Sequence, residues 1–292
     1  MFFRTKLTQL MLSIIAAFAS FGLMAQQEIA LDQDLRPLWE AGAFVGVFHS
    51  PVYPAAAQRQ TNIIPSPYFI YRGETVRLGE GSIARAVAVD TSWYELDLSL
   101  AGSFSANSDD NPARAGMPDL DFIFELGPQL RVQLKEIEFE HQGKGELFLN
   151  LQTRAAFSTD FSRLDHRGYV FQPELSYRQR GWFSEKTALS LSISPTWATQ
   201  RLHDYFYQVD ADFVNNERPA YDAKGGYLGT DLSLGMSFNA RENIRVFVGG
   251  TVSIHAGAAN EDSPLFREKS TYSIGMGVVW RLWESEERVA GR

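Results

Sequence analysis

The chain has 292 residues, of which 45% are hydrophobic, 13% aromatic and 21% charged, and its formal net charge at pH 7 is −8. This acidic balance, with no block of Lys or Arg, argues against a nucleic-acid-binding surface, which needs clustered basic groups to replace counterions. The absence of cysteine excludes disulfides, a thiol nucleophile and thiolate metal sites, and the composition is too apolar for disorder and too polar for a bundle of membrane helices.

The first 25 residues have the pattern of a secretory signal peptide. Arg4 and Lys6 precede the apolar run Met11 to Phe18, and the small residue Ala25 suits cleavage. This apolar run is shorter than the roughly 20 residues that a membrane-spanning helix requires, and no later segment meets that length either. We therefore expect residues 1–25 to be removed on export and residues 26–37 to form a periplasmic segment before the folded domain.

The rest of the chain is dominated by hydrophobic and polar residues that alternate with a period of two. This period is typical of β-strands, because successive side chains of a strand point to opposite faces. No segment shows a convincing helical period. The predicted strands are Trp39 to His49, Pro65 to Val76, Tyr94 to Phe104, Phe122 to Val132, Leu147 to Phe157, Tyr169 to Arg178, Leu189 to Trp197, Leu228 to Phe238, Ile244 to Ile254 and Tyr272 to Leu282.

The length of these strands favours a membrane barrel. They match the roughly 9–11 tilted residues that cross a bilayer, whereas the strands of a secreted β-sandwich, the rival interpretation, are shorter. We therefore predict an all-β fold, an antiparallel transmembrane β-barrel of 10–12 strands over residues 38–283, followed by a polar C-terminal tail over residues 284–292. The extended stretch Ile83 to Val89 either continues its neighbour through a bulge or, with a second missed strand, raises the number to twelve.

The connections indicate how the barrel is oriented. Outer-membrane barrels have short periplasmic turns and long outer loops, and Asn239 to Glu242 is a short turn. Four connections are long: Ser105 to Pro118, Ser158 to Gly168, Arg201 to Gly226 and Ala256 to Lys269. An interfacial aromatic girdle at the periplasmic strand ends is predicted to contain Trp39, Trp93, Trp182, Trp280 and Trp283.

Charged residues recur on the polar face of the strands, which is expected to line the barrel lumen. A barrel of this size is narrow enough for side chains to fill most of its interior. The opposite charges are therefore expected either to pair as a salt-bridged plug or to line a selective channel. The predicted inward set comprises Glu95, Asp97, Asp121, Glu125, Glu174 and Asp231 together with Arg131, Arg154, Arg178, Arg245 and Arg281.

The five histidines, His49, His141, His166, His203 and His255, form no recognised metal or nucleophile motif. The best catalytic candidate is His203 beside Asp204, Asp210 and Asp212, and a solvated loop histidine is the simpler interpretation. His255, near serines at a strand end, would suit a barrel hydrolase, but serines are common lumen residues here. Asp109, Asp110, Asp119 and Asp121 lack the spacing of a calcium loop. We therefore expect no catalytic residue, no metal and no cofactor.

Short motifs spread over nearly the whole mature chain resemble those of the MipA/OmpV outer-membrane proteins. They depart from the family at Val52, where an acid is usual, and in the extension past Leu282. The motifs are Ser50-Pro51-Val52-Tyr53-Pro54, Tyr71-Arg72-Gly73, Ala113-Arg114-Ala115-Gly116-Met117-Pro118-Asp119-Leu120, Gly127-Pro128, Asp204-Tyr205-Phe206-Tyr207, the set Tyr221, Ala223, Gly225 and Gly226, and Asp262-Ser263-Pro264-Leu265.

This resemblance implies an outer-membrane barrel without catalytic residues, whose founding type is a scaffold that interacts with a lytic transglycosylase. The expected function is therefore a scaffold for peptidoglycan-remodelling enzymes, with a lytic transglycosylase and a peptidoglycan synthase as partners. The alternative is a narrow pore for small solutes. A scaffold needs an exposed periplasmic surface, and the candidates are Lys135 to Glu146, Gln179 to Lys186 and Glu284 to Arg292.

Overall fold

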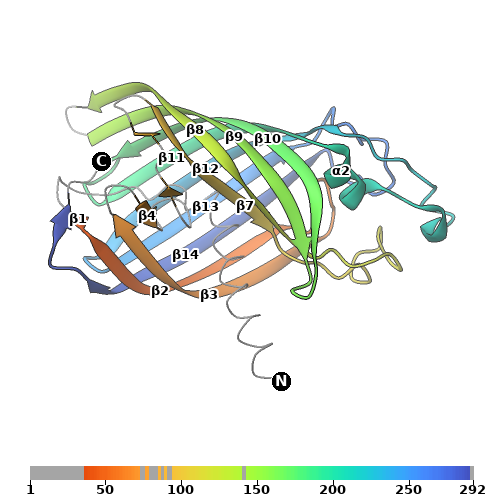
Figure 1. Ribbon diagram of the computed structural model, residues 1–292, viewed down its shortest axis with the longest axis horizontal. Coiled ribbons are helices and arrows are strands. Elements are labelled where there is room, and N and C mark those ends of the chain that lie inside the picture. Colours follow the sequence, from red (N-terminus) through yellow and green to blue (C-terminus); the bar gives the residue numbers. More distant parts are fainter. Residues whose placement is uncertain are drawn as a thin grey trace, which may run out of the picture.

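The computed structural model describes residues 36–72, 76–78, 85–86, 89–90, 94–139 and 143–289. The predicted signal peptide, Trp93 and His141 lie outside these residues. The described strands form an antiparallel barrel (Figure 1). In chain order they are β2 (Trp39–Pro51), β3 (Arg59–Arg72), β4 (Val76–Leu78), β5 (Arg85–Ala86), β6 (Val89–Asp90), β7 (Tyr94–Ser103), β8 (Phe122–Phe139), β9 (Gly143–Thr159), β10 (Leu164–Arg180), β11 (Thr187–Ala198), β12 (Gly226–Arg241), β13 (Ile244–Ile254) and β14 (Ser270–Glu284).

The strands pair in chain order, and the last long strand returns to the first. β14 pairs with β2, and β2 pairs with β3. β4 pairs with β3 and β5, whereas β6 pairs with β7, and β5 also contacts β7. The short strands therefore occupy the gap between β3 and β7. The sheet has thirteen strands in the described residues; β5 lies within the extended stretch expected from Ile83 to Val89, and β6 begins at its last residue.

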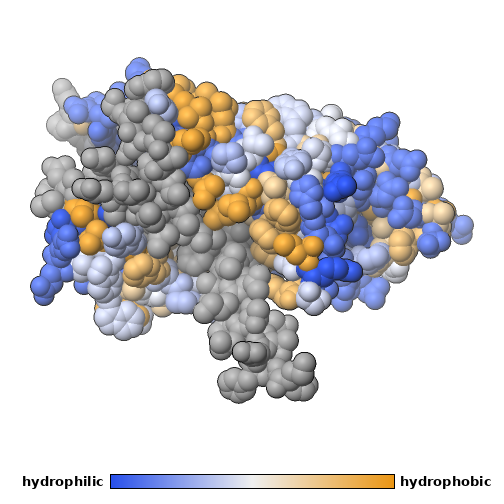
Figure 2. Space-filling model, in the orientation of Figure 1, coloured by the Kyte–Doolittle hydropathy of each residue, from blue (hydrophilic) through white to orange (hydrophobic). Residues whose placement is uncertain are grey.

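Alternating burial divides each long strand into an inner and an outer face. On β2, Phe44 and Phe48 are buried inside, while Val45 and Val47 point outward and are exposed. Many large apolar side chains are exposed in the same way, among them Met276 at 57%, and Figure 2 shows hydrophobic patches over the strand wall. Such a belt is unfavourable in water but is what a lipid bilayer requires.

The β11–β12 connection contains a helix that no helical period in the sequence indicated, α2 (Gln200–Tyr207), followed by a short 3₁₀ turn, η1 (Ala211–Phe213). The buried residues of α2 are Leu202, His203, Phe206 and Tyr207. The helix is amphipathic, but its eight residues make too few turns for a helical period to stand out in the sequence. No helix in the described residues is long and apolar enough to cross a membrane.

The two ends of the barrel differ. α2 and the long loops lie at one end, whereas β1 (Arg36–Pro37) and β15 (Arg288–Val289) form a small antiparallel sheet at the other (Figure 1). Because long loops of outer-membrane barrels face outward, the α2 end is the outer end and the β1–β15 end is periplasmic. Part of the predicted polar tail is therefore folded against the segment that precedes β2.

We expect the charge tolerance of β13 to follow this inside–outside alternation. Val248 points outward with 47% of its surface exposed, so Val248→Arg should destabilise the folded barrel by about 2–4 kcal/mol if this position lies at mid-depth. Thr251 pairs with Ser233 through their hydroxyls over 2.9 Å inside the barrel, so Thr251→Asn should be tolerated. Urea titrations in lipid vesicles measure both. Equal losses at the two positions would contradict the assigned orientation.

Candidate functional site

The barrel interior contains a network of polar side chains centred on Arg154 of β9. Its Nε donates to Oε2 of Glu125 over 2.8 Å, and its Nη2 donates to Oε1 of Gln172 over 2.7 Å. Its Nη1 donates to the hydroxyl of Ser99 over 3.2 Å. One guanidinium group, with only 4% of its side chain exposed, thus joins strands β7, β8, β9 and β10.

A second group of contacts adjoins this network toward the periplasmic end. Nε of Arg131 donates to Oδ1 of Asn150 over 3.1 Å, and Nδ2 of Asn150 donates to Oε1 of Glu174 over 2.8 Å. The guanidinium groups of Arg131 and Arg178 lie over the Phe148 ring, 5.7 and 5.5 Å from its centroid. The structure therefore brings five of the predicted inward residues together on β8, β9 and β10: Glu125, Arg131, Arg154, Glu174 and Arg178.

The other predicted inward residues lie elsewhere. Asp97 is buried on β7, with Glu95 two residues before it at the start of that strand. Asp231 lies in the outer part of β12, and Asp121 comes just before β8 at the outer end. Arg245 and Arg281 lie at the periplasmic end of β13 and β14. The predicted set is thus divided between one wall of the lumen and its two ends.

Removal of the Arg154 guanidinium tests how much this group contributes to the stability of the barrel. Arg154→Ala leaves the Glu125 carboxylate buried without its ion-pair partner, so we expect a loss of about 3–5 kcal/mol in the free energy of unfolding. Arg163→Ala is the matched control, because Arg163 pairs with Asp165 over 3.3 Å with 68% of its side chain exposed; it should cost less than about 1 kcal/mol. Similar losses for the two variants would contradict the central role of Arg154.

At the outer end the long loops pack into a folded cap with its own apolar core. The loops that join β2 to β3, β7 to β8, β11 to β12 and β13 to β14 all contribute to it. Because these loops start on different sides of the ring, they must cross the barrel mouth to meet. The buried side chains of the cap core include Tyr53, Leu202, Phe206, Tyr207 and Leu265.

Hydrogen bonds from the rings to main-chain carbonyls hold the cap loops to one another. The Tyr53 hydroxyl donates to the carbonyl of Leu265 over 2.8 Å, and the Tyr207 hydroxyl donates to the carbonyl of Pro54 over 2.8 Å. The Ser263 hydroxyl donates to the carbonyl of Tyr207 over 2.9 Å. Motif residues from three separate loops therefore stabilise the cap by binding one another.

Arg114 has the same role in the β7–β8 loop. It is buried and donates to the carbonyls of Phe206 over 3.3 Å and Pro118 over 3.2 Å. Its guanidinium lies 5.8 Å from the centroid of the Tyr53 ring. Burial lowers the pKa of Arg114 and raises the pKa of the Tyr53 hydroxyl. Gly116 turns this loop with a φ of +78°, a conformation that favours glycine.

His203, the catalytic candidate of the sequence, is a structural residue of the cap. It is fully buried, and Nδ2 of Asn260 donates to its Nδ1 over 2.7 Å. The ring proton therefore resides on Nε2, which donates to the carbonyl of Gly226 over 3.1 Å. Both ring nitrogens are thus engaged, and none of the neighbouring aspartates is its partner. Burial lowers the pKa of the His203 imidazole from its ordinary value of 6.5.

The lowered pKa predicts that the cap loosens in acid. Below pH 6.5 the unfolded chain protonates this imidazole while the folded cap resists protonation, so stability present above that pH is lost as the pH falls. Limited proteolysis of the outer loops at about pH 7.5 and about pH 5.5 measures this loss. His203→Gln should weaken the pH dependence. His166→Gln is the control, because His166 contacts Arg201 at the surface; a pH dependence that is the same in all three proteins would contradict the prediction.

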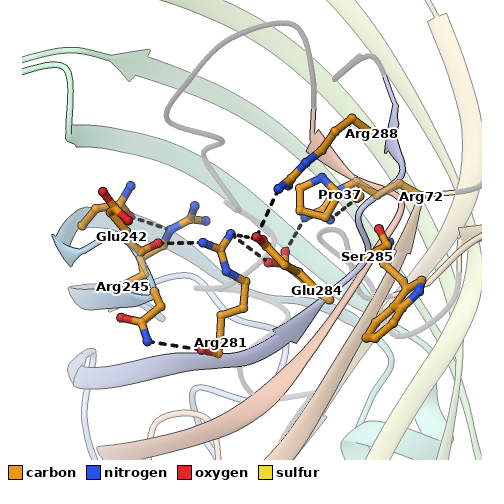
Figure 3. A network of polar contacts seen from close by, with 12 residues as sticks. Pro37, Arg72, Glu242, Arg245, Arg281, Glu284, Ser285 and Arg288 are labelled. Atoms are coloured by element: carbon orange, nitrogen blue, oxygen red, sulfur yellow. Dashed lines mark hydrogen bonds and ion pairs between the residues drawn. The ribbon is translucent and has the colours of Figure 1, made fainter.

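A second ionic cluster lies at the periplasmic end (Figure 3). Arg72 forms a buried ion pair with Glu40 and donates to the carbonyl of Pro37 over 3.0 Å. Arg281 lies 3.6 Å from Glu40 and 3.1 Å from Glu284. The cluster joins β2, β3 and β14 to the segment that carries β1. This contact gives the motif residue Arg72 a structural role.

Sequence reasoning missed Glu40, the carboxylate at the centre of this cluster. Its position in the alternation of the first strand was the available signal, since Glu40, Gly42 and Phe44 share the inner face of β2. The neighbouring motif residue Tyr71 pairs with Trp39 across the β2–β3 ladder.

The motif Gly127-Pro128 lies in the wall of the barrel, where the described pairing of β8 with β9 is interrupted. The register passes from Leu126 opposite Ala155 to Gln129 opposite Gln152. A Cβ atom at Gly127 would lie 1.9 Å from the carbonyl oxygen of Thr153, so this close approach requires glycine.

An antiparallel barrel with an apolar outer belt, a polar interior and long loops at one end is a transmembrane β-barrel of the outer membrane. A family model described as MltA-interacting protein MipA matches residues 43–282. The chain therefore belongs to the MipA family of outer-membrane proteins. This confirms the family expected from the motifs. A comparison with curated proteins gives no significant match.

Solved structures of other outer-membrane barrels are similar at low identity. The NanC porin is 9% identical, with 84% of this chain and 100% of that chain covered and a TM-score of 0.37. An outer membrane channel from Pseudomonas putida F1 is 12% identical, with 86% and 98% covered and a TM-score of 0.38. Outer membrane phospholipase A from Escherichia coli is 10% identical, with 90% and 97% covered and a TM-score of 0.33.

Proposed function

We propose that this protein is a non-enzymatic scaffold of the outer membrane that binds a lytic transglycosylase, and with it a peptidoglycan synthase, at its periplasmic end. The family description, an MltA-interacting protein, supports a partner of this kind. We place the docking surface on the β8–β9 hairpin, because this hairpin extends beyond the neighbouring strand β7.

At the periplasmic end, the described part of β8 continues past its partner strand β7. The pairing of β7 with β8 reaches Tyr94 opposite Val132, whereas β8 continues to Phe139 and pairs on its other side with β9. Among the described residues, no strand pairs with β8 from Gln133 to Phe139 on the edge that faces away from β9. Such an edge can accept a strand from another protein through main-chain hydrogen bonds.

The side chains of the hairpin suit recognition of a soluble partner. Leu134 is 50% exposed, and charged residues surround it, including the exposed ion pair of Lys144 with Glu136 at 2.7 Å. An apolar anchor within alternating charges favours a contact that is steered by electrostatics and weakened by salt. The candidate segment Lys135 to Glu146 of the sequence falls within this surface, and residues 140–142 lie outside the described part.

The absence of an enzymatic role is part of the same proposal. His203 and His255 use both ring nitrogens in hydrogen bonds of the fold. In the part of the chain that the structure describes, no group of three His, Asp or Glu side chains is placed to hold a metal ion. The cap that crosses the outer mouth favours the scaffold over the alternative, a narrow pore for small solutes.

Site-specific photo-cross-linking in native envelopes tests the docking surface. A cross-linking residue in place of Leu134 should trap a lytic transglycosylase, because Leu134 is the exposed apolar side chain on the free edge. The matched control replaces Val214, an apolar residue of similar exposure, 46%, in the outer β11–β12 loop. Cross-links that form only from Val214, or that contain only the barrel-assembly machinery, would overturn the scaffold proposal.

A further inference from the structure

A cavity of about 280 Å³ lies inside the barrel beneath the cap. Strands β12, β13 and β14 line one side with hydroxyl groups, including those of Ser233, Thr251 and Thr271. The rings of Phe48 and Phe104, which belong to one apolar cluster, also line the cavity. Its lining contains none of the side chains bonded to Arg154, so the cavity is a separate feature of the interior.

Asp231 is the acidic side chain among the described residues that line this cavity. It lies on β12 opposite Ser253 of β13 and is hydrogen-bonded to the Ser253 side chain. No lysine or arginine is among the described residues that line the cavity, and in the described part of the chain no salt bridge reaches Asp231. A carboxylate removed from bulk water without a cationic partner is unfavourable.

His255, which also lines the cavity, does not supply a positive charge to pair with Asp231. The backbone N–H of Ala55 donates to Nε2 of His255 over 3.2 Å, so this nitrogen accepts a hydrogen bond. The ring proton therefore resides on Nδ1, which donates to the carbonyl of Leu228 over 3.1 Å. His255 is thus held as a neutral imidazole and supplies no positive charge to Asp231.

From this combination we propose that the cavity is a binding site for a small organic cation, an ammonium group carried on an apolar body. The ammonium would pair with the Asp231 carboxylate and donate to the surrounding hydroxyls, while the Phe48 and Phe104 rings would contact the apolar part and attract the charge through their π faces. A neutral solute leaves the carboxylate uncompensated, and an anion is repelled by it. The volume fits a ligand smaller than most drug-sized molecules.

This site is independent of the scaffold proposal, because it lies under the outer cap and the docking edge lies at the other end. Calorimetric titration of the detergent-solubilised full chain with benzylammonium tests it, and benzyl alcohol and benzoate serve as the neutral and anionic analogues. We expect saturable binding of benzylammonium and at least about tenfold weaker binding of both analogues.

Two variants assign the binding to Asp231. Asp231→Asn should weaken benzylammonium binding at least about tenfold, whereas Glu174→Gln, a buried carboxylate outside the cavity, should leave it unchanged. Ser253→Lys places an ammonium next to Asp231 and should abolish binding while the barrel still folds, which a heat-dependent shift in gel mobility would show. The proposal is overturned by a lack of saturable binding, by equal binding of benzyl alcohol, or by unchanged binding to folded Asp231→Asn or Ser253→Lys.

Discussion

The structure depends on one constraint: within a bilayer, backbone N–H and C=O groups find no water and must pair with each other. A sheet can meet this constraint only by closing on itself. Here β14 pairs with β2, and the short strands β4, β5 and β6 occupy the gap between β3 and β7. Closure then determines the chemistry of both faces. Outward side chains meet lipid and are apolar, while inward side chains share a narrow space and must satisfy their own polar groups.

The inward side chains satisfy their polar groups differently on the two sides of the barrel. On β7 to β10, Arg154 and its amide and carboxylate partners form a hydrogen-bonded wall. Opposite, Phe44, Phe48 and Ile64 form an apolar cluster against which Phe104 packs. Where these two kinds of wall approach the outer end they leave the cavity that contains Asp231. An interior built this way holds the Asp231 carboxylate apart from Arg154, which pairs with Glu125, and this separation is the basis of the proposed cation site.

The family motifs fall mainly at the two ends of the barrel, and the structure gives them a common role. Tyr53, Arg114 and Ser263 bind main-chain carbonyls of other loops in the cap. Arg72 does the same for Pro37 at the periplasmic end. Such contacts fasten loops and chain segments to the barrel rim. They leave the protruding β8–β9 hairpin as an exposed part of the periplasmic end, which is why the proposed partner contact is placed there.

The strands, their inward and outward faces and their location in a membrane could be predicted from the sequence alone, because a period of two over a bilayer-spanning length is a local property. The segment Ile244 to Ile254, for example, is both the predicted strand and β13. Contacts between distant loops could not be predicted in this way: Tyr53 reaches Leu265 across 212 positions, and His203 meets Asn260 across 57. The ring closure decides which strand ends, and therefore which loops, are neighbours. Closure of the barrel buries His203 in the cap, places Glu40 beside Arg72 and leaves Asp231 facing a cavity. Each of these outcomes depends on side chains that only the closed barrel brings together.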